Sequence, residues 1–162
     1  MPDISLQFVA ERALSCAVIG WFSAGHLSHV DAILPDGMLF GARSDRVGDR
    51  PRGVWARPPG YLRFSRRALA SLPASDEQYA LWLAFLAAQT GKPYDWRAIW
   101  GFVLNRDWRR EDSWICSELQ ARALEIAGIV PPLYLAANKI TPVALALAVS
   151  AVPGAAIRAL PP

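Results

Sequence analysis

The sequence predicts an α+β fold in which the strands come first and the helices follow. Short apolar and polar alternations, separated by turn signals, occupy residues 4–65, whereas helical spacing and capping signals dominate from Ser75 onward. The length of 162 residues is that of one ordinary domain, and no stretch has the composition of a linker. We therefore expect residues 1–162 to form a single domain.

The first half of the chain has the signals of antiparallel strands. Residues 4–10 alternate between apolar and polar side chains. Residues 29–34 and 38–42 flank Pro35-Asp36-Gly37, a turn signal, so this segment predicts a hairpin. Further short strands are expected at residues 54–56 and 61–65, in a region rich in arginine, glycine and proline.

The second half has the signals of helices. Ser75 and Gln78 have the spacing of a capping box, and the helix that follows is expected to stop at Gly91. Ser113 or Asp112 is expected to cap a helix over residues 114–127. The remaining predictions are shorter helices at 16–24 and 95–104, a helix from Thr141-Pro142 to about residue 152, and a short final strand.

Composition excludes several classes of protein. Hydrophobic residues make up 53% and charged residues 19% of the chain, which excludes a disordered chain, a coiled coil, collagen and a solenoid. Two distant cysteines make neither a disulfide framework nor a tetrahedral thiolate zinc site. No helix-turn-helix, glycine-rich phosphate loop or stacked-aromatic RNA motif is present, so nucleic acid is not expected as a partner.

Basic residues concentrate in one segment. Residues 43–67 hold eight arginines and two aspartates, a local net charge of +6 in a chain whose total is +3. The simpler interpretation is a solvated loop face; the alternative is a patch for phosphates or an anionic wall polymer. No signal peptide is visible, and the longest apolar run, residues 142–157, is too short for a membrane span. The default compartment is the cytoplasm, with release to the cell wall as an alternative.

Cys116 is the first candidate for chemistry. It lies at the predicted start of a helix, where free backbone N–H groups and the helix dipole favour the thiolate and can receive an oxyanion. The alternative is a small buried apolar residue, which is also the interpretation of Cys16.

His29 is the second candidate, because it starts a predicted strand and a base on a rigid strand end is well placed to face a helix N-terminus. The alternative is a structural histidine. The chain has only two histidines, and His26 is interpreted as an ordinary loop residue, so a cysteine–histidine enzyme must use one of them.

Three segments, taken in order, resemble one protein family. They are Ser28-His29-Val30-Asp31-Ala32-Ile33, Gly91-Lys92-Pro93-Tyr94-Asp95 and Cys116-Ser117-Glu118-Leu119. Their order is similar to that of the circularly permuted papain-like hydrolases of the NlpC type, in the YiiX-like branch, where the histidine strand precedes the cysteine helix. The resemblance covers residues 4–141. It implies a permuted papain-like fold, with an antiparallel sheet of four to six strands packed against the helix that carries Cys116.

The resemblance also implies roles. Cys116 would be the nucleophile, His29 the base, and the backbone N–H of Cys116 part of the oxyanion site. The family's third residue is polar and orients the imidazole from the adjacent strand, but the matching position falls near Gly41, which has no side chain. The possible substitutes are Asp31, Ser44 and Asp45, or a backbone carbonyl or water.

The implied function is a bacterial or phage cysteine hydrolase, a peptidase or amidase acting on an amide or ester carbonyl, with peptidoglycan stem peptides or related amides as substrates. Two alternatives stay open: an acyltransferase or lipid amidase, and a catalytically degenerate binding module, which the missing side chain at Gly41 favours. No cofactor is expected, and the sequence gives no oligomeric state.

Aromatic residues are candidates for a substrate groove: Trp55, Tyr61, Tyr94 and Trp114. The structural alternative is that Trp55 and Tyr61 anchor the arginine-rich loop and that Tyr94 packs beneath a helix capped by Asp95. Glu118 is interpreted as serving its helix N-terminus electrostatically rather than as an acid catalyst.

The candidates for a mixed metal site are His26 and His29, with Cys116 or Asp31. The three-residue spacing of the histidines brings both to one face only in a helix, and this segment predicts a loop leading into a strand. No metal is therefore expected.

Overall fold

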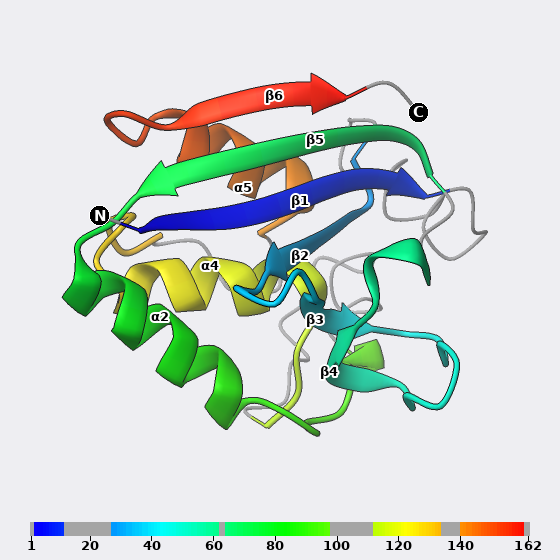
Figure 1. The fold of residues 1–162 in the computed structure, drawn as a ribbon. Coiled ribbons are helices and arrows are strands. Elements are labelled where there is room, and N and C mark those ends of the chain that lie inside the picture. The colour runs from blue at the N-terminus through cyan, green and yellow to red at the C-terminus, as the bar shows by residue number, and fades with distance from the viewer. Residues whose placement is uncertain (1, 12–26, 62–63, 98–111, 134–139, 161–162) are drawn as a thin grey trace.

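The structure, a computed structural model, describes residues 2–61, 64–97, 112–133 and 140–160 with the exception of residues 12–26. One six-stranded antiparallel sheet, in the order β4-β3-β2-β1-β5-β6, forms the centre of the fold (Figure 1). The strands are β1 (Asp3–Glu11), β2 (His29–Ile33), β3 (Leu39–Arg43), β4 (Gly53–Arg57), β5 (Phe64–Pro73) and β6 (Ala156–Leu160). The α+β class and the antiparallel sheet expected from the sequence are confirmed.

Strands β2 and β3 form the predicted hairpin. Ala32 pairs with Phe40 and Ile33 with Leu39 across the turn at residues 35–37, where Gly37 has a positive φ of 80°. This value is one that glycine adopts without steric cost. The turn fixes the register of the hairpin, and the register decides which side chains of β2 and β3 lie opposite one another.

The longest strand is the one that the sequence predicted worst. Residues 59–61 form a 3₁₀ turn, and β5 runs from Phe64 to Pro73, so the strand predicted at 61–65 overlaps β5 only at Phe64 and Ser65, and most of the strand was missed. The segment Arg66-Arg67-Ala68 has weak strand propensity. Its strand state comes from pairing, because β5 lies between β1 and β6 and bonds to both.

The described helices include α2 (Asp76–Ala88), α4 (Cys116–Ile126) and α5 (Pro142–Ser150). Ser75 caps α2 in the predicted capping box, with Gln78 completing the reciprocal hydrogen bond. Thr141 caps α5 through its hydroxyl, and proline occupies the first turn as predicted. The predicted helix at 16–24 lies outside the described residues. That at 95–104 is described only at its start, where Trp96 and Arg97 are helical.

The core lies between one face of the sheet and the helices. Alternate residues of neighbouring strands form a continuous apolar row, as with Leu6, Ala32 and Phe40, which are register partners and all buried. Helix α4 packs against β2 and β3, α2 against α4, and α5 against β5 (Figure 1). In the part of the chain that the structure describes, no helix combines the length and apolarity needed to cross a membrane.

Candidate functional site

His29 and Asp31 are the first two members of the candidate site, and both come from β2. Two residues apart on one strand, they project from the same face. Nε2 of His29 donates a hydrogen bond to Oδ1 of Asp31 at 2.9 Å. The residues are 5% and 0% exposed, respectively. A buried carboxylate that accepts this bond fixes both the ring orientation and the position of the Nε2 proton.

Gly41 on β3 makes room for the Asp31 carboxylate. Continuing the register of the hairpin places residue 41 opposite residue 31. A Cβ built on Gly41 would collide with Oδ1 of Asp31, so the carboxylate occupies the volume that a side chain on β3 would take. A carboxylate from β2 therefore lies where the resemblance implied a polar group from β3.

The other two candidates for the third residue lie elsewhere. Asp45 accepts from Nε and Nη2 of Arg43 at 2.7 and 3.0 Å. Partial burial opposes ionisation of Asp45, but the hydrogen bonds and charge of Arg43, with a smaller contribution from His29, lower its pKa. Ser44 is half-buried, and the structure shows no hydrogen bond from it to His29. Of the three, Asp31 is the residue that contacts the imidazole.

Cys116 is the first residue of α4 and is 4% exposed. The prediction that Ser113 or Asp112 caps this helix was wrong: the N-cap is Ile115, which offers no side-chain hydrogen bond. The helix starts later than predicted because the preceding residues are extended and pair with the 93–95 segment. An aliphatic N-cap leaves the first amides of α4 without a side-chain acceptor from that position.

His29 also interacts with Cys116, so the three side chains form one buried cluster. Burial disfavours the charged ring, but the Asp31 carboxylate and Cys116, by charge and by hydrogen bonding, together raise the pKa of His29 to about 10. Because Nε2 is bonded to Asp31, Nδ1 is the ring nitrogen left for the cysteine sulfur. This arrangement favours an imidazolium that lies between a carboxylate and a sulfur.

The Gly91-Lys92-Pro93-Tyr94-Asp95 segment connects the edge of the sheet to the start of α4. Two hydrogen bonds join it to β4, from the Val54 N–H to the Lys92 carbonyl and from the Gly91 N–H to the Val54 carbonyl. Two more bonds pair Pro93 and Asp95 with the backbone of Trp114. Cys116 follows Trp114 by two residues, so this segment sets the distance between the sheet and the sulfur.

The predicted groove residues have different surroundings. Trp55 on β4 is the register partner of Gly41, and the guanidinium of Arg50 lies 5.6 Å from its ring centroid. The ring of Trp114 packs edge-to-face on Phe85, and its Nε1 donates to Gln89. Tyr94 packs edge-to-face on Trp96. The side chain of Tyr61 lies outside the described part of the chain.

Several polar residues that support the site were not singled out from the sequence. Arg57 is fully buried and donates to four backbone carbonyls, including that of Gly41. Nε2 of Gln120, on α4, donates to the Phe40 carbonyl at 2.8 Å, which ties the cysteine helix to β3. Polar residues at core-facing positions of an apolar strand or helix were the available signal.

The described residues contain only part of the hypothetical mixed metal site, since His26 lies outside them. No group of three or more histidine, cysteine, aspartate or glutamate side chains lies there in an arrangement that could hold a metal ion. His26 and Cys16 lie outside the described residues. Asp95 and Glu118 are buried, and Glu118 lies in the first turn of α4 as expected.

Comparisons with known proteins give a fold but no family. No protein-family model matches the chain, and no curated protein matches it. Among solved structures, the chain is similar to the metalloprotein YiiX from Escherichia coli O157:H7, described as DUF1105, with a TM-score of 0.64 and 14% sequence identity. The match covers 97% of this chain and 96% of that one. The chain therefore has a YiiX-like α+β fold.

Proposed function

We propose that this chain is a cysteine hydrolase with a permuted papain-like fold, in which Cys116 and His29 are the catalytic residues and Asp31 positions the imidazole. The observation that carries the proposal is the buried cluster in which His29 bonds to Asp31 through Nε2 and interacts with Cys116. A nucleophile, a base and a group that orients the base are the parts that nucleophilic catalysis needs.

The chemistry follows from the protonation state of the cluster. The raised pKa of His29 favours an imidazolium beside the Cys116 sulfur, and the proposed reaction uses that sulfur as the thiolate, its nucleophilic form. The thiolate sulfur attacks the carbonyl carbon, and the carbonyl oxygen becomes an oxyanion that the Cys116 backbone N–H helps to bind. His29 then donates its proton to the leaving amine or alkoxide, the bond to the leaving group breaks, and a thioester remains on Cys116.

Hydrolysis of the thioester restores the enzyme. The neutral imidazole takes a proton from water as its oxygen attacks the thioester carbonyl. The carbon–sulfur bond breaks, the acid leaves, and Cys116 and His29 return to thiolate and imidazolium. The Asp31 carboxylate stays bonded to Nε2 throughout and stabilises the charged ring.

The position of Asp31 bears on the alternative of a degenerate binding module. That alternative rested on the absence of a side chain at Gly41. The carboxylate that fills the same volume supplies the missing acceptor, which favours an enzyme over a binding module. An acyltransferase would form the same thioester and differ in using an amine or alcohol in place of water.

The description of YiiX as a metalloprotein raises the question of whether this chain would hold a metal. Its donor set does not fit one. Nε2 of His29 is engaged by Asp31, so His29 and Asp31 bind each other rather than converge on an ion. No group of three or more histidine, cysteine, aspartate or glutamate side chains among the described residues is arranged to hold a metal ion, so we derive no step through a metal.

Active-site titration tests the proposal. A panel of 4-nitrophenyl esters and peptide anilides is offered to the wild-type chain and to the Cys116→Ala variant, and a thiol-directed probe is mapped by peptide mass spectrometry. We expect turnover and labelling at Cys116 that the variant lacks, with a trapped thioester of the expected mass. Labelling that goes to Cys16, or turnover that survives in Cys116→Ala, would contradict the proposal. Transfer to added hydroxylamine or alcohol in preference to water would favour the acyltransferase.

A further inference from the structure

The loop between β3 and β4, residues 44–52, carries three exposed arginines. Arg46, Arg50 and Arg52 are exposed, and the structure shows no ion pair for them among the described residues. By contrast Arg43 is engaged by Asp45, and Arg57 by backbone carbonyls. Arg43 and Arg57 are thus buried and bonded within the fold, whereas Arg46, Arg50 and Arg52 are exposed.

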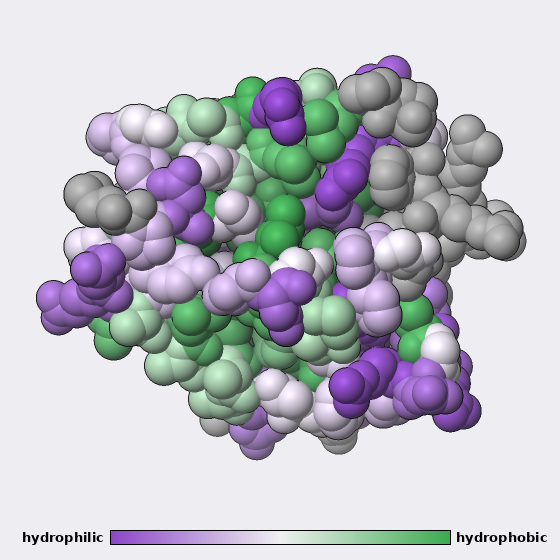
Figure 2. All heavy atoms as spheres, in the orientation of Figure 1, coloured by the Kyte–Doolittle hydropathy of each residue, from purple (hydrophilic) through white to green (hydrophobic). Residues whose placement is uncertain are grey.

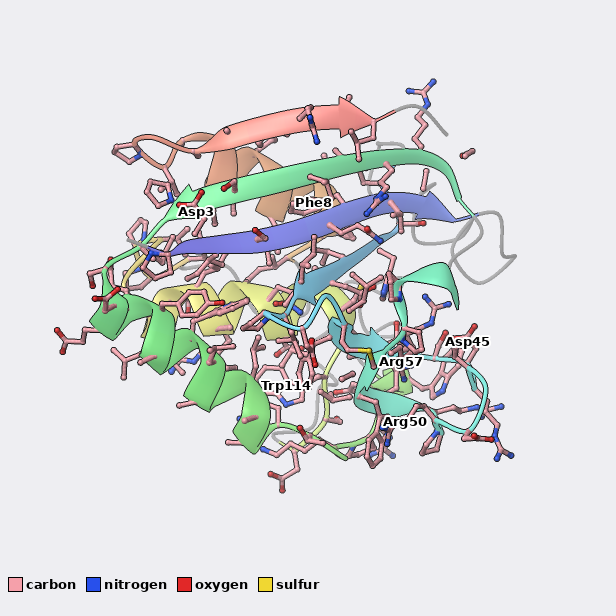
Figure 3. All side chains as sticks on the ribbon, viewed as in Figure 1. Asp3, Phe8, Asp45, Arg50, Arg57 and Trp114 are labelled. Atoms are coloured by element: carbon pink, nitrogen blue, oxygen red, sulfur yellow. The ribbon has the colours of Figure 1, made fainter. Side chains whose placement is uncertain are left out.

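Both ends of this loop lie beside the proposed site. It begins after Arg43, the last residue of β3, which the continued register of the hairpin places opposite His29. It ends at Gly53, which lies against Lys92 and Pro93, and Pro93 bonds to Trp114 just before Cys116. Figure 3 labels Asp45 and Arg50 on this loop, with Arg57 beside it.

The loop has a defined conformation that holds its arginines in place. Val47 and Arg50 exchange two backbone hydrogen bonds, of 3.1 and 3.0 Å, around a turn in which Gly48 has a φ of 55°. The Arg50 guanidinium lies over the ring of Trp55. Trp55 is in turn the register partner of Gly41, over which the Asp31 carboxylate lies. Trp55, Gly41 and Asp31 therefore lie in one row across β4, β3 and β2, with Arg50 over the Trp55 end of that row.

We propose that the exposed arginines of the 44–52 loop bind an anionic group, a carboxylate or a phosphate, on the substrate of the Cys116 site. The proposal rests on the proposed function for its placement and names the class of substrate: an acyl compound with a negative charge away from the scissile carbonyl. Guanidinium groups suit both anions because their N–H donors match paired oxygens. The loop also holds two exposed acids, Asp45, which pairs with Arg43, and Asp49. Figure 2 shows hydrophilic side chains gathered over this corner of the molecule.

A binding experiment tests the anion site without relying on catalysis. The indole N–H signal of Trp55, assigned with Trp55→Phe, is followed by NMR while the Cys116→Ala protein is titrated with glutarate, inorganic phosphate or neutral glutaramide. We expect a saturable shift with at least one anion and none with glutaramide. The triple variant Arg46→Ala/Arg50→Ala/Arg52→Ala should lose the response, and Arg158→Ala, on the opposite edge of the sheet, should keep it.

The results of the titration either identify the class of anion or overturn the proposal. A response to phosphate that greatly exceeds the response to glutarate assigns the loop to phosphate esters, and the reverse assigns it to carboxylates. An equal shift with glutaramide, no shift with either anion, or an unchanged shift in the triple variant overturns the proposal. A loss of response in Arg158→Ala equal to that in the triple variant would also overturn it, because the effect would then be one of net charge alone.

A turnover experiment links the anion site to the reaction. The ratio of kcat/KM for 4-nitrophenyl hydrogen glutarate to that for 4-nitrophenyl butanoate is measured at low and high salt. We expect the ratio to fall about threefold for each arginine removed and roughly tenfold or more for the triple variant, with a similar fall at high salt. A ratio that stays constant would overturn the proposal. If neither ester is hydrolysed faster than by Cys116→Ala, the proposed function fails, while the titration still decides the anion site.

Discussion

Charged side chains are buried where β2 meets α4, whereas they are exposed in the loop between β3 and β4. At the junction, the charged groups of His29 and Asp31 are buried and bonded to each other. In the loop, Arg46 and Arg52 point their charges into solvent. A buried pair must be matched within the fold, since an unmatched buried charge is costly. Exposed charges carry little such constraint, so they are free to meet a ligand.

If the proposed function holds, the comparison places the geometry of the reaction and the choice of substrate in different parts of one sheet. The strand pair β2–β3 fixes the relation of imidazole to carboxylate, and the connection that follows β3 presents the arginines. Substitutions at the junction should therefore change the rate of the chemical step. Substitutions in the loop should change the preference between substrates.

Replacing Asp31 should have the largest effect after loss of Cys116 or His29 themselves. Asp31→Ala removes the acceptor of the Nε2 proton and leaves a cavity in place of the carboxylate, and we expect kcat to fall by about 100-fold with little change in KM. Asp31→Asn keeps an acceptor oxygen without the charge and should lose less. Circular dichroism would show whether Asp31→Ala is folded. An unchanged kcat in the folded variant would contradict the proposed positioning role of Asp31.

The pH dependence of kcat/KM should also test the buried pair of His29 and Asp31. The folded pKa of His29 is raised, so the stability that its charged form contributes is fully present below the unfolded value of 6.5 and is lost as pH rises toward about 10. We expect the high-pH limb of kcat/KM to fall near pH 10, and Asp31→Asn to move that limb to lower pH because the attraction of the carboxylate is gone. A high-pH limb that lies at the same pH in Asp31→Asn would count against the pairing of His29 with Asp31.

Gly41→Ala is expected to lower kcat only because it displaces the side chain of Asp31. The added methyl group would displace the carboxylate from its bond to His29, and we expect about a tenfold loss in kcat. In an Asp31→Ala background there is nothing to displace, so the second substitution should cost almost nothing. Equal losses in the two backgrounds would show that Gly41 acts by some route other than Asp31.

A rescue variant complements this cycle. Asp31→Ala/Gly41→Asn moves the polar group back to β3, where the family resemblance expected it. Partial recovery of kcat relative to Asp31→Ala would support the exchange of positions across the hairpin. Failure to recover, with the fold intact, would restrict the role to a carboxylate on β2.

The smallest effect is expected far from the site, at the capping box of α2. Ser75→Ala removes the hydroxyl that accepts from the Gln78 N–H, and we expect the free energy of unfolding to fall by about 1 kcal/mol. Thermal melts would measure the loss, while kcat and the substrate ratio stay at wild-type values. A change in activity here would mean that stability and chemistry are not separable in this domain.

The sequence predicted those parts of the fold that local chemistry determines. The capping box at Ser75, the Thr141-Pro142 helix start and the hairpin turn at Gly37 are confirmed, because each depends on residues only a few positions apart. The extent of β5 was missed, since its strand state depends on pairing with β1 and β6 rather than on its own propensity.

The candidate site was predictable only in part, because one of its residues depends on strand pairing. Cys116 and His29 could be selected from the residue types and their order, but Asp31, Ser44 and Asp45 stayed equivalent as third residues. Choosing among them needs the register of β2 against β3, which the sequence leaves open. The start of α4 at Cys116 was also missed, because Ile115 becomes the N-cap through tertiary pairing of the residues before it.

The titration of the His29 ring tests the central claim most directly. In protein labelled with ¹³C and ¹⁵N at histidine, the ring signals of His29, assigned with His29→Gln, are followed by NMR from pH 5 to pH 11. The account predicts a midpoint far above 6.5, near 10, in the wild-type chain and a lower one in both Cys116→Ala and Asp31→Asn. A wild-type midpoint near 6.5 that neither substitution moves would contradict it.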